Sequence, residues 1–345
     1  MPSLTSRLVA LAALAIVPLG VLTACSSSSS SGGGASAGSA GSAELKDGFG
    51  GRSTNRNVEF ITYYDPTQDA FWNQIKQGAE DAAKLANFTL KEETAAGDTG
   101  KMTDLINAAV ASKPAALVIP FNDPAWENAA CEASQAGIPV FAYNVPPAGP
   151  AKSCIQAFVG QDFYEVGALV GQKLIDSVQL TAGDKVLCPA EEPSQQYAIQ
   201  RGGGVESVLK TKGVKCTYLQ TTGEDAPALD KMQAWLTANK DVKAIVPLGG
   251  TPHRNAVQAE DAAGVKVPIV GFDTSPQVID GIKSGRIIAT ADQQGYVQGF
   301  QPVAEAALFL DFGLSPATIN SGGNSLIDKS NVNNLEDKAL QGVRW

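Results

Sequence analysis

Apolar stretches with strand character alternate with helical patterns from Val58 onward, and this alternation constrains the fold more than any other feature. The strand-like stretches fall into two series, at Val58, Thr89, Leu117 and Val140, then at Lys185, Val214, Ala244 and Pro268. Their spacing of roughly 23 to 30 residues suits βα units and parallel sheets. The strands are nearly all apolar, as expected when helices cover both faces of a sheet. The predicted fold class is therefore α/β, with two similar doubly wound parallel-sheet lobes.

The lobes are expected to be joined by several chain crossings. The first falls near Gly160–Asp162, and the strand–helix segment 286–312 is predicted to bring the chain back to the first lobe. A further crossing is expected near 313–323. The expected N-terminal lobe is 57–160 plus 292–315, and the expected C-terminal lobe is 161–291 plus 316–345. Such crossings would form a hinge beside a cleft. Ligands of open α/β sheets bind at the carboxyl ends of the strands, which would face each other across that cleft.

The N-terminus predicts export. Arg7 precedes an apolar run, Leu8 to Leu22, which is shorter than the roughly 20 residues of a transmembrane helix. Leu-Thr-Ala-Cys, ending at Cys25, resembles the lipobox of bacterial lipoproteins, which implies a signal peptide at 1–24 and a lipid on Cys25. The Ser/Gly-rich stretch 25–56 would be a tether. The predicted location is the outer face of the bacterial cytoplasmic membrane, to which only the lipid would attach the protein. An ordinary signal peptide that happens to contain a cysteine is the alternative.

Composition narrows the classes of partner and cofactor. The 345 residues are 44% hydrophobic and 18% charged, with a net charge of −9 and no clustered basic run, which argues against nucleic acid. His253 is the only histidine and no Cys-x-x-Cys occurs, so we expect neither a metal site nor any other cofactor.

The four cysteines besides Cys25 favour disulfides in an exported chain. Four cysteines allow three pairings, and spacing alone does not choose among them. Cys188 and Cys216 occupy similar places in successive predicted strands, where parallel neighbours about 4.8 Å apart suit a bridge. This predicts Cys188–Cys216 in the second lobe and Cys131–Cys154 in the first.

The residues just beyond the predicted strands are rich in carboxylates, amides and aromatics, and Arg254 is the only cation near them. Carboxylates and amides hydrogen-bond to hydroxyl groups, and aromatic faces stack on the C–H faces of sugar rings. An anionic ligand would require Arg or Lys here. The pattern therefore predicts a polyol site. The predicted ligand-binding residues are Tyr64, Asp69, Phe71, Trp72, Asn144, Tyr197, Thr251, Asp273 and Gln293.

Structural alternatives exist for several residues in these loops. Asp123 and Ser275 are equally explained as N-caps of the following helices. Phe71 and Trp72 could belong to the core, although neighbours on a helix point about 100° apart, so that at least one could face the cleft. Glu191 and Glu192 fit a solvated loop, and His253 fits a helix start.

The order of three motifs resembles the type I periplasmic sugar-binding family, over about Val58 to Leu314. The motifs are segment 69–79, with its aromatic pair and Gly-Ala; segment 137–144; and Val270–Asp273 with the following 281–285 and 289–293. The resemblance implies that Asp273 and Gln293 bind ligand. Two of the family's cationic positions are Val145 and Ile199 here, so the usual clamp of arginines on hydroxyls is expected to be missing, with Tyr143, Tyr197 or backbone groups in its place.

What the family implies is a solute-binding lipoprotein of an ABC importer, a monomer whose partners are a sugar or polyol and the permease subunits. An enzyme is disfavoured because the chain lacks a Gly-x-Ser-x-Gly elbow, a P-loop and a metal cluster. A sugar-responsive repressor would need a basic helix-turn-helix before Val58, where the Ser/Gly-rich stretch lies instead. Delivery of the ligand to a chemoreceptor or sensor kinase remains an open alternative.

Overall fold

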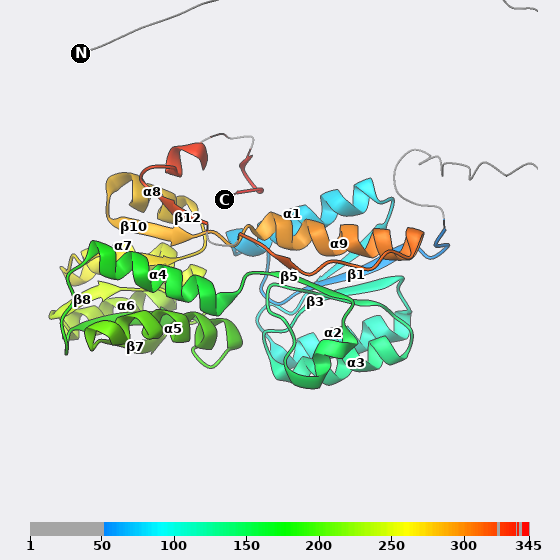
Figure 1. Cartoon of the computed structure of the whole chain (residues 1–345), viewed down its shortest axis with the longest axis horizontal. Coiled ribbons are helices and arrows are strands. Elements are labelled where there is room, and N and C mark those ends of the chain that lie inside the picture. The colour runs from blue at the N-terminus through cyan, green and yellow to red at the C-terminus, as the bar shows by residue number, and fades with distance from the viewer. Residues whose placement is uncertain (1–51, 323–324, 336, 338–339, 345) are drawn as a thin grey trace, which may run out of the picture. The chain divides into compact units, whose positions relative to one another are not determined.

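The computed structural model describes residues 52–322, 325–335, 337 and 340–344, which form two α/β lobes (Figure 1). The expected signal peptide, Cys25 and the tether as far as residue 51 lie outside the described residues. In the part that the structure describes, no helix is long and apolar enough to cross a membrane.

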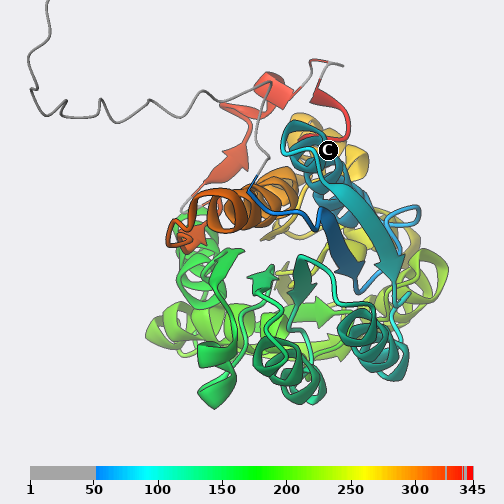
Figure 2. The same ribbon diagram turned by 90° about the vertical axis from the view of Figure 1, so that its right-hand side faces the viewer.

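The first lobe is a sheet of strand order β11-β5-β4-β3-β1-β2, whose neighbouring strands are parallel. Helices α1 and α9 cover one face, and α2 and α3 cover the other (Figure 2). The elements are β1 Asn57–Thr62, α1 Ala70–Leu85, β2 Thr89–Thr94, α2 Thr99–Ser112, β3 Ala116–Pro120, η1 Pro124–Trp126, α3 Glu127–Gln135, β4 Val140–Tyr143, η2 Gly149–Cys154, β5 Ala157–Gly160, α9 Gly295–Phe312 and β11 Ile319–Asn320.

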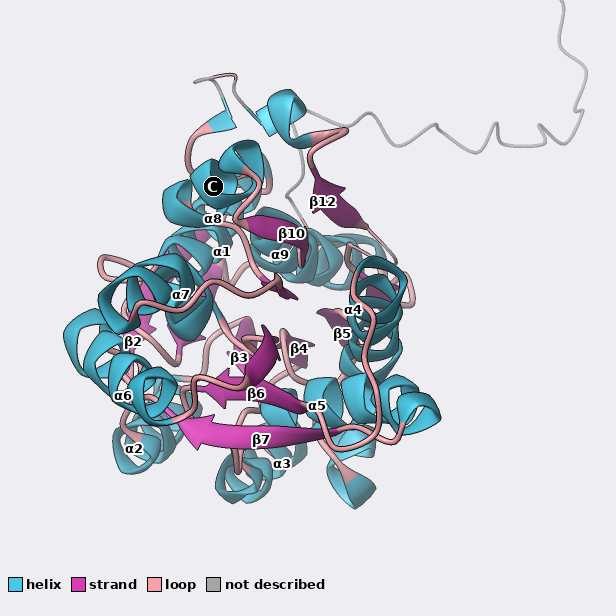
Figure 3. Cartoon of the chain, turned by 90° about the vertical axis from the view of Figure 1, so that its left-hand side faces the viewer, coloured by secondary structure: helices cyan, strands magenta, loops and turns pink. Residues whose placement is uncertain are grey.

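The second lobe repeats this plan with the order β12-β10-β9-β8-β6-β7, in which only β12 is antiparallel to its neighbour among the described strands. Helices α4 and α5 lie on one face, and α6 and α7 on the other (Figure 3). The elements are α4 Phe163–Ser177, β6 Lys185–Ala190, α5 Gln196–Leu209, η3 Lys210–Lys212, β7 Lys215–Gln220, α6 Asp225–Ala238, β8 Val242–Ile245, α7 Gly250–Ala263, β9 Ile269–Phe272, α8 Pro276–Ser284, β10 Ile287–Ala291, β12 Leu326–Asp328 and η4 Val332–Leu335.

The chain passes between the lobes after β5, after β10 and after β11. The connecting segments are bonded to one another: the Gln161 side chain donates to the Asp292 carbonyl (3.3 Å), and the Ser321 amide donates to the Gly160 carbonyl (2.9 Å). A Cβ on Gly322 would lie 2.2 Å from the Asp292 oxygen, so this crossing requires glycine.

Two glycine-containing helix pairs bring backbones into close contact. A Cβ on Gly299 of α9 would lie 1.8 Å from the Ile75 carbonyl oxygen of α1, and a Cβ on Gly204 of α5 would lie 2.1 Å from the Tyr164 oxygen of α4. Gly204 of the run Gly202–Gly204 therefore serves helix packing, whereas a Cβ on Gly202 would meet the Tyr218 side chain of β7. Each lobe thus has a tightly packed helix pair against its sheet.

The structure contains both predicted disulfides, Cys131–Cys154 between α3 and η2, and Cys188–Cys216 between β6 and β7. It also contains three short strands that the sequence pattern does not reveal, β5, β11 and β12. Because β11 pairs with β5 in the first sheet, the last crossing lies after Asn320, inside the segment 313–323 where a crossing is expected. A two-residue strand offers no periodicity from which it could be recognised.

Candidate ligand-binding site

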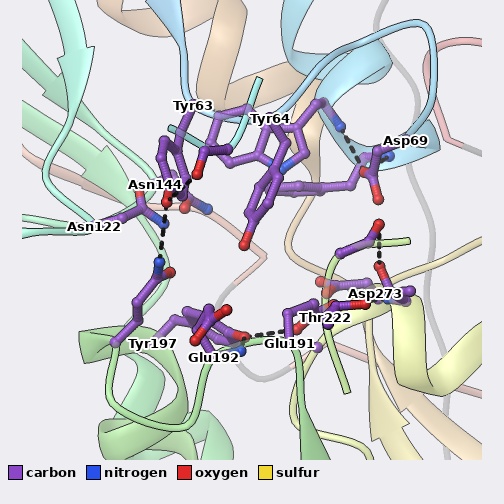
Figure 4. A pocket seen from close by; sticks show the side chains of 18 of the residues that line it. Tyr63, Tyr64, Asp69, Asn122, Asn144, Glu191, Glu192, Tyr197, Thr222 and Asp273 are labelled. Carbon is purple, nitrogen blue, oxygen red and sulfur yellow. Dashed lines mark hydrogen bonds between the residues drawn. The ribbon is translucent and has the colours of Figure 1, made fainter. Parts of the chain in front are cut away.

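A cavity of about 650 Å³ lies between the lobes, within the range typical of small-molecule sites. Its wall is formed by residues that follow strands of both sheets, such as Tyr64 after β1, Asn144 after β4, Glu191 after β6 and Asp273 after β9. In Figure 4, Tyr63, Tyr64 and Asp69 face Glu191, Glu192 and Thr222 across this space. All nine predicted ligand-binding residues line the cavity. Their contact with a ligand remains a prediction.

The first lobe contributes an aromatic wall. Tyr64 and Trp72 meet edge to face with ring centroids 5.9 Å apart, and Phe71 meets Trp72 in the same manner. Both members of the aromatic pair line the cavity, Trp72 being buried and Phe71 half-buried. Burial raises the pKa of the Tyr64 hydroxyl, with a smaller effect from Glu191, so this hydroxyl remains a neutral donor.

The two lobes place one polar residue each in an equivalent strained turn. Asn144 after β4 has φ 61° and Asp273 after β9 has φ 72°, and their amides donate to Val159 and Ala291 on the neighbouring strands. The left-handed conformation is uncommon outside glycine and costs free energy, and such residues cluster at functional sites. The turn directs both side chains into the space between the lobes.

A hydrogen-bonded network at the base of the cavity connects the lobes. Asn144 donates to the Gln293 side-chain oxygen (3.3 Å), and the Gln293 amide donates to Asp273. Arg201 then donates to the other Asp273 oxygen (3.5 Å) and to the Leu248 carbonyl (2.6 Å). Gln293 therefore links a residue of each lobe beside the crossing that follows β10.

Arg201 is a cation that the sequence analysis did not place in the site. The expectation that Arg254 is the only cation near the site is wrong, because Arg201 is 2% exposed and lines the cavity beside Asp273. Its guanidinium also lies 4.5 Å from the Phe272 ring centroid and 4.8 Å from that of Phe163. Ile199, which occupies the family's usual arginine position, is 49% exposed. Tyr143 does not replace the clamp, because its hydroxyl donates to the Ile61 carbonyl in the core.

Glu191 contradicts the expectation of a solvated loop. Its side chain is buried and accepts hydrogen bonds from the Tyr197 hydroxyl (2.6 Å) and the Thr251 amide (2.8 Å). Burial raises the pKa of the Glu191 carboxyl above its ordinary value, although both of these hydrogen bonds oppose the shift. Glu192, by contrast, is partly exposed and accepts from Gln220 (2.6 Å).

Asp123, Ser275 and His253 each have a structural role. Asp123 accepts from the Ala125 amide as the N-cap of η1 and also lines the cavity. Ser275 caps α8 and lies outside the main cavity wall. His253 is fully buried against the Phe272 carbonyl (2.7 Å), and burial lowers its pKa to about 4.

Asp69 has two roles at the mouth of the cavity. One carboxylate oxygen caps α1 by accepting from the Phe71 and Trp72 amides, and the other bonds Arg254 of α7 in the second lobe (2.9 Å). Arg254 also bonds Asp225 (2.7 Å). The predicted cation of the second lobe therefore binds protein carboxylates at the edge of the site.

Comparison with known proteins identifies the family. The sequence profile described as periplasmic binding protein domain matches residues 60–313. The chain belongs to this family. The resemblance to its type I sugar-binding group is confirmed, and with it the prediction of a binding protein rather than an enzyme.

Members of the family with assigned ligands are similar along most of their length. The chain is 28% identical to the xylose/arabinose-binding protein of Sulfolobus acidocaldarius, over 80% of this chain and 71% of that protein. It is 30% identical to the D-ribose/D-allose-binding protein of Pseudomonas aeruginosa, over 62% and 67% respectively. A carbohydrate transporter from Acidothermus cellulolyticus, solved with myo-inositol, superposes with a TM-score of 0.73 and 30% identity, covering 84% of this chain and all of that one.

Proposed function

We propose that this protein is the extracytoplasmic solute-binding component of an ABC importer, which captures a sugar or polyol between its lobes and delivers it to the permease. The observation that supports this most directly is the composition of the cavity wall. Carboxylates and amides from both lobes, Asp273, Asn144 and Gln293, surround a space bordered by the rings of Tyr64 and Trp72. This combination suits a ring with several hydroxyl groups.

The proposed mechanism of capture is closure. A ligand that contacts Asn144 on one lobe and Asp273 on the other makes both contacts only when the lobes are together. Its free energy of binding therefore favours the closed arrangement. We expect the hydrogen bonds among the chain crossings to persist while the lobes open and close.

A thermal-shift screen of pentoses, hexoses and inositols tests this function. A ligand at about 100 times its Kd stabilises the folded state by roughly 2.7 kcal/mol, which is readily visible as a higher melting temperature. Hits are then titrated by calorimetry. Failure of every sugar and polyol to stabilise the protein would refute the proposed ligand class.

We also propose that Cys25 carries the lipid that holds the protein at the membrane. The support is sequence alone: the apolar run, the motif ending at Cys25, and the Ser/Gly-rich stretch that follows. The wild-type protein should partition into detergent, and Cys25→Ala should leave it in the aqueous phase or unprocessed. Aqueous partitioning of both forms would show that Cys25 bears no lipid.

A further inference from the structure

The Glu191 carboxylate differs from almost every other buried carboxylate among the described residues, because no Lys or Arg pairs with it. The buried acids that do pair with a cation are Glu59, Glu260, Asp273, Asp292 and Asp311. Glu305 lacks a cation too, but it is bonded to the Ala317 amide and lies away from the cavity. Glu191 is therefore the unpaired buried carboxylate of the cavity wall.

The backbone around Glu191 is shaped to hold it there. A Cβ on Gly249 would lie 1.8 Å from one carboxylate oxygen, so a larger residue just before α7 would displace the Glu191 side chain from its present position. The donors Tyr197 and Thr251 both belong to the second lobe, so the carboxylate is fixed before any ligand arrives. An ionised carboxylate accepts about four hydrogen bonds, and these two donors leave the remainder for the cavity.

The cavity wall presents further acceptors from both lobes and an aromatic face from the first lobe. Asn122 Oδ1 and Gln195 Oε1 are buried atoms of the cavity lining that have no hydrogen-bond partner. The Tyr64 ring extends from the first lobe toward Glu191 (Figure 4). Aromatic faces attract cations as well as sugar C–H groups. In the described wall the only Lys or Arg is Arg201, and it is bonded to Asp273 and Leu248.

We propose that the ligand is a polyhydroxylated molecule that carries a protonated amine, an amino sugar or an aminocyclitol, and that Glu191 binds the ammonium group. An isolated charge in a buried site is costly unless an opposite charge pairs with it. An ammonium supplies that charge and also hydrogen-bond donors for the free acceptors. The inference rests on the proposed function, because the same cavity binds the hydroxyl groups.

Matched ligands test the charge directly in the intact protein. Calorimetric titrations compare myo-inositol with an inosamine, and D-galactose with D-galactosamine and N-acetyl-D-galactosamine, below the pKa of the amines. The amines should bind at least about tenfold more tightly than the neutral members, a difference of about 1.4 kcal/mol. N-acetylation removes the charge and should abolish the advantage.

Glu191→Gln identifies the residue responsible. The amide keeps one acceptor oxygen for the Thr251 amide, and its NH2 group can donate to the Tyr197 hydroxyl oxygen, but it carries no charge. The preference for amines should therefore disappear, and amines and neutral members should bind the variant with similar affinity. Glu165→Gln is the matched control, since it removes one charge from an exposed position of the same lobe, outside the cavity wall. It should retain the full preference.

The outcomes separate this inference from the function on which it rests. Neutral polyols that bind the wild-type protein as tightly as their amines would overturn the inference and leave the proposed function standing. Absence of binding by both series would overturn both. A preference for amines that survives in Glu191→Gln would show that Glu191 is not the partner of the ammonium.

Discussion

Asp273 is the single residue on which binding should depend most. Its carboxylate is held by Arg201 and Gln293 in a strained turn, and charge-assisted hydrogen bonds to ligand hydroxyls contribute about 1.5–3 kcal/mol each. Asp273→Ala should therefore weaken binding by about one to two orders of magnitude, since 1.4 kcal/mol corresponds to about tenfold. Calorimetric titration with a hit from the sugar screen measures the change.

Asp123→Ala is the companion experiment for Asp273. The Asp123 side chain already accepts from the Ala125 amide as the cap of η1, so its loss should lower stability by about 1 kcal/mol with little change in affinity. An Asp273→Ala variant that binds as tightly as wild type would place the hydroxyl contacts elsewhere in the cavity.

The raised pKa of Glu191 predicts a pH-dependent gain of stability in the unliganded Glu191→Gln variant. The pKa of Glu in an unfolded chain is near 4.3, and the pKa of Glu191 is higher in the folded protein. Below the unfolded value this difference stabilises the folded state, and the contribution is lost as the pH rises through the folded-state pKa. Gln does not titrate. The melting temperature of the variant relative to wild type should therefore be higher at neutral pH than in acid. Parallel thermal unfolding across pH measures this, and a constant difference would refute a cost of ionisation at Glu191.

For single residues, the sequence could predict the position in the fold but not the hydrogen-bond and ion-pair partners. Tyr64, Asn144 and Asp273 follow strands, and the carboxyl ends of parallel strands meet at one edge, so their position in the cleft follows from local pattern. Glu191 obeys the same rule, but its burial depends on Gly249 and Thr251, about 60 residues away in sequence. Arg201 bonds Asp273, which lies 72 residues away in sequence, and nothing in the local sequence of α5 indicates this pair.

At the scale of elements, the disulfide Cys131–Cys154 joins α3 to η2, the short helix that precedes β5 in the first sheet. It closes a loop between cysteines 23 residues apart, for which removal should cost roughly 2–4 kcal/mol. The double variant Cys131→Ala/Cys154→Ala should melt at a lower temperature and keep its ligand affinity, because the bridge lies within one lobe. Thermal unfolding and calorimetry together test this. An unchanged melting temperature would mean that the bridge adds no stability, and mass mapping that found a bridge between lobes would contradict both pairings.

Long elements were predictable and short ones were not. The alternation of strands and helices identified the βα units from β1 to β4 and from β6 to β9, because most of these strands are apolar runs and most are followed by a helix. Strands β11 and β12 have two and three residues, and only pairing with β5 and β10 makes them strands. The exact position of the last crossing depends on these pairings, so the sequence could indicate only the segment that contains it.

For the whole molecule, the contact between Asp69 and Arg254 joins the lobes at the mouth of the cavity. The two side chains are only 19% and 11% exposed, so salt screens their attraction less than that of a surface pair. They belong to α1 and α7, elements of different lobes, and the bond exists only while the lobes are together. It should therefore stabilise the closed arrangement specifically.

Arg254→Met removes the charge and keeps most of the length of the side chain. A loss of about 1 kcal/mol from the closed state alone should weaken ligand binding about fivefold, mainly through faster dissociation. Small-angle scattering should show a larger radius of gyration for the variant at subsaturating ligand, and saturating ligand should restore the wild-type value. Arg286→Met is the control, because Arg286 pairs with Glu260 and Asp261 inside the second lobe. It should lower the melting temperature without changing affinity. Equal loss of affinity in both variants would mean that the Asp69–Arg254 pair contributes to general stability and not to closure.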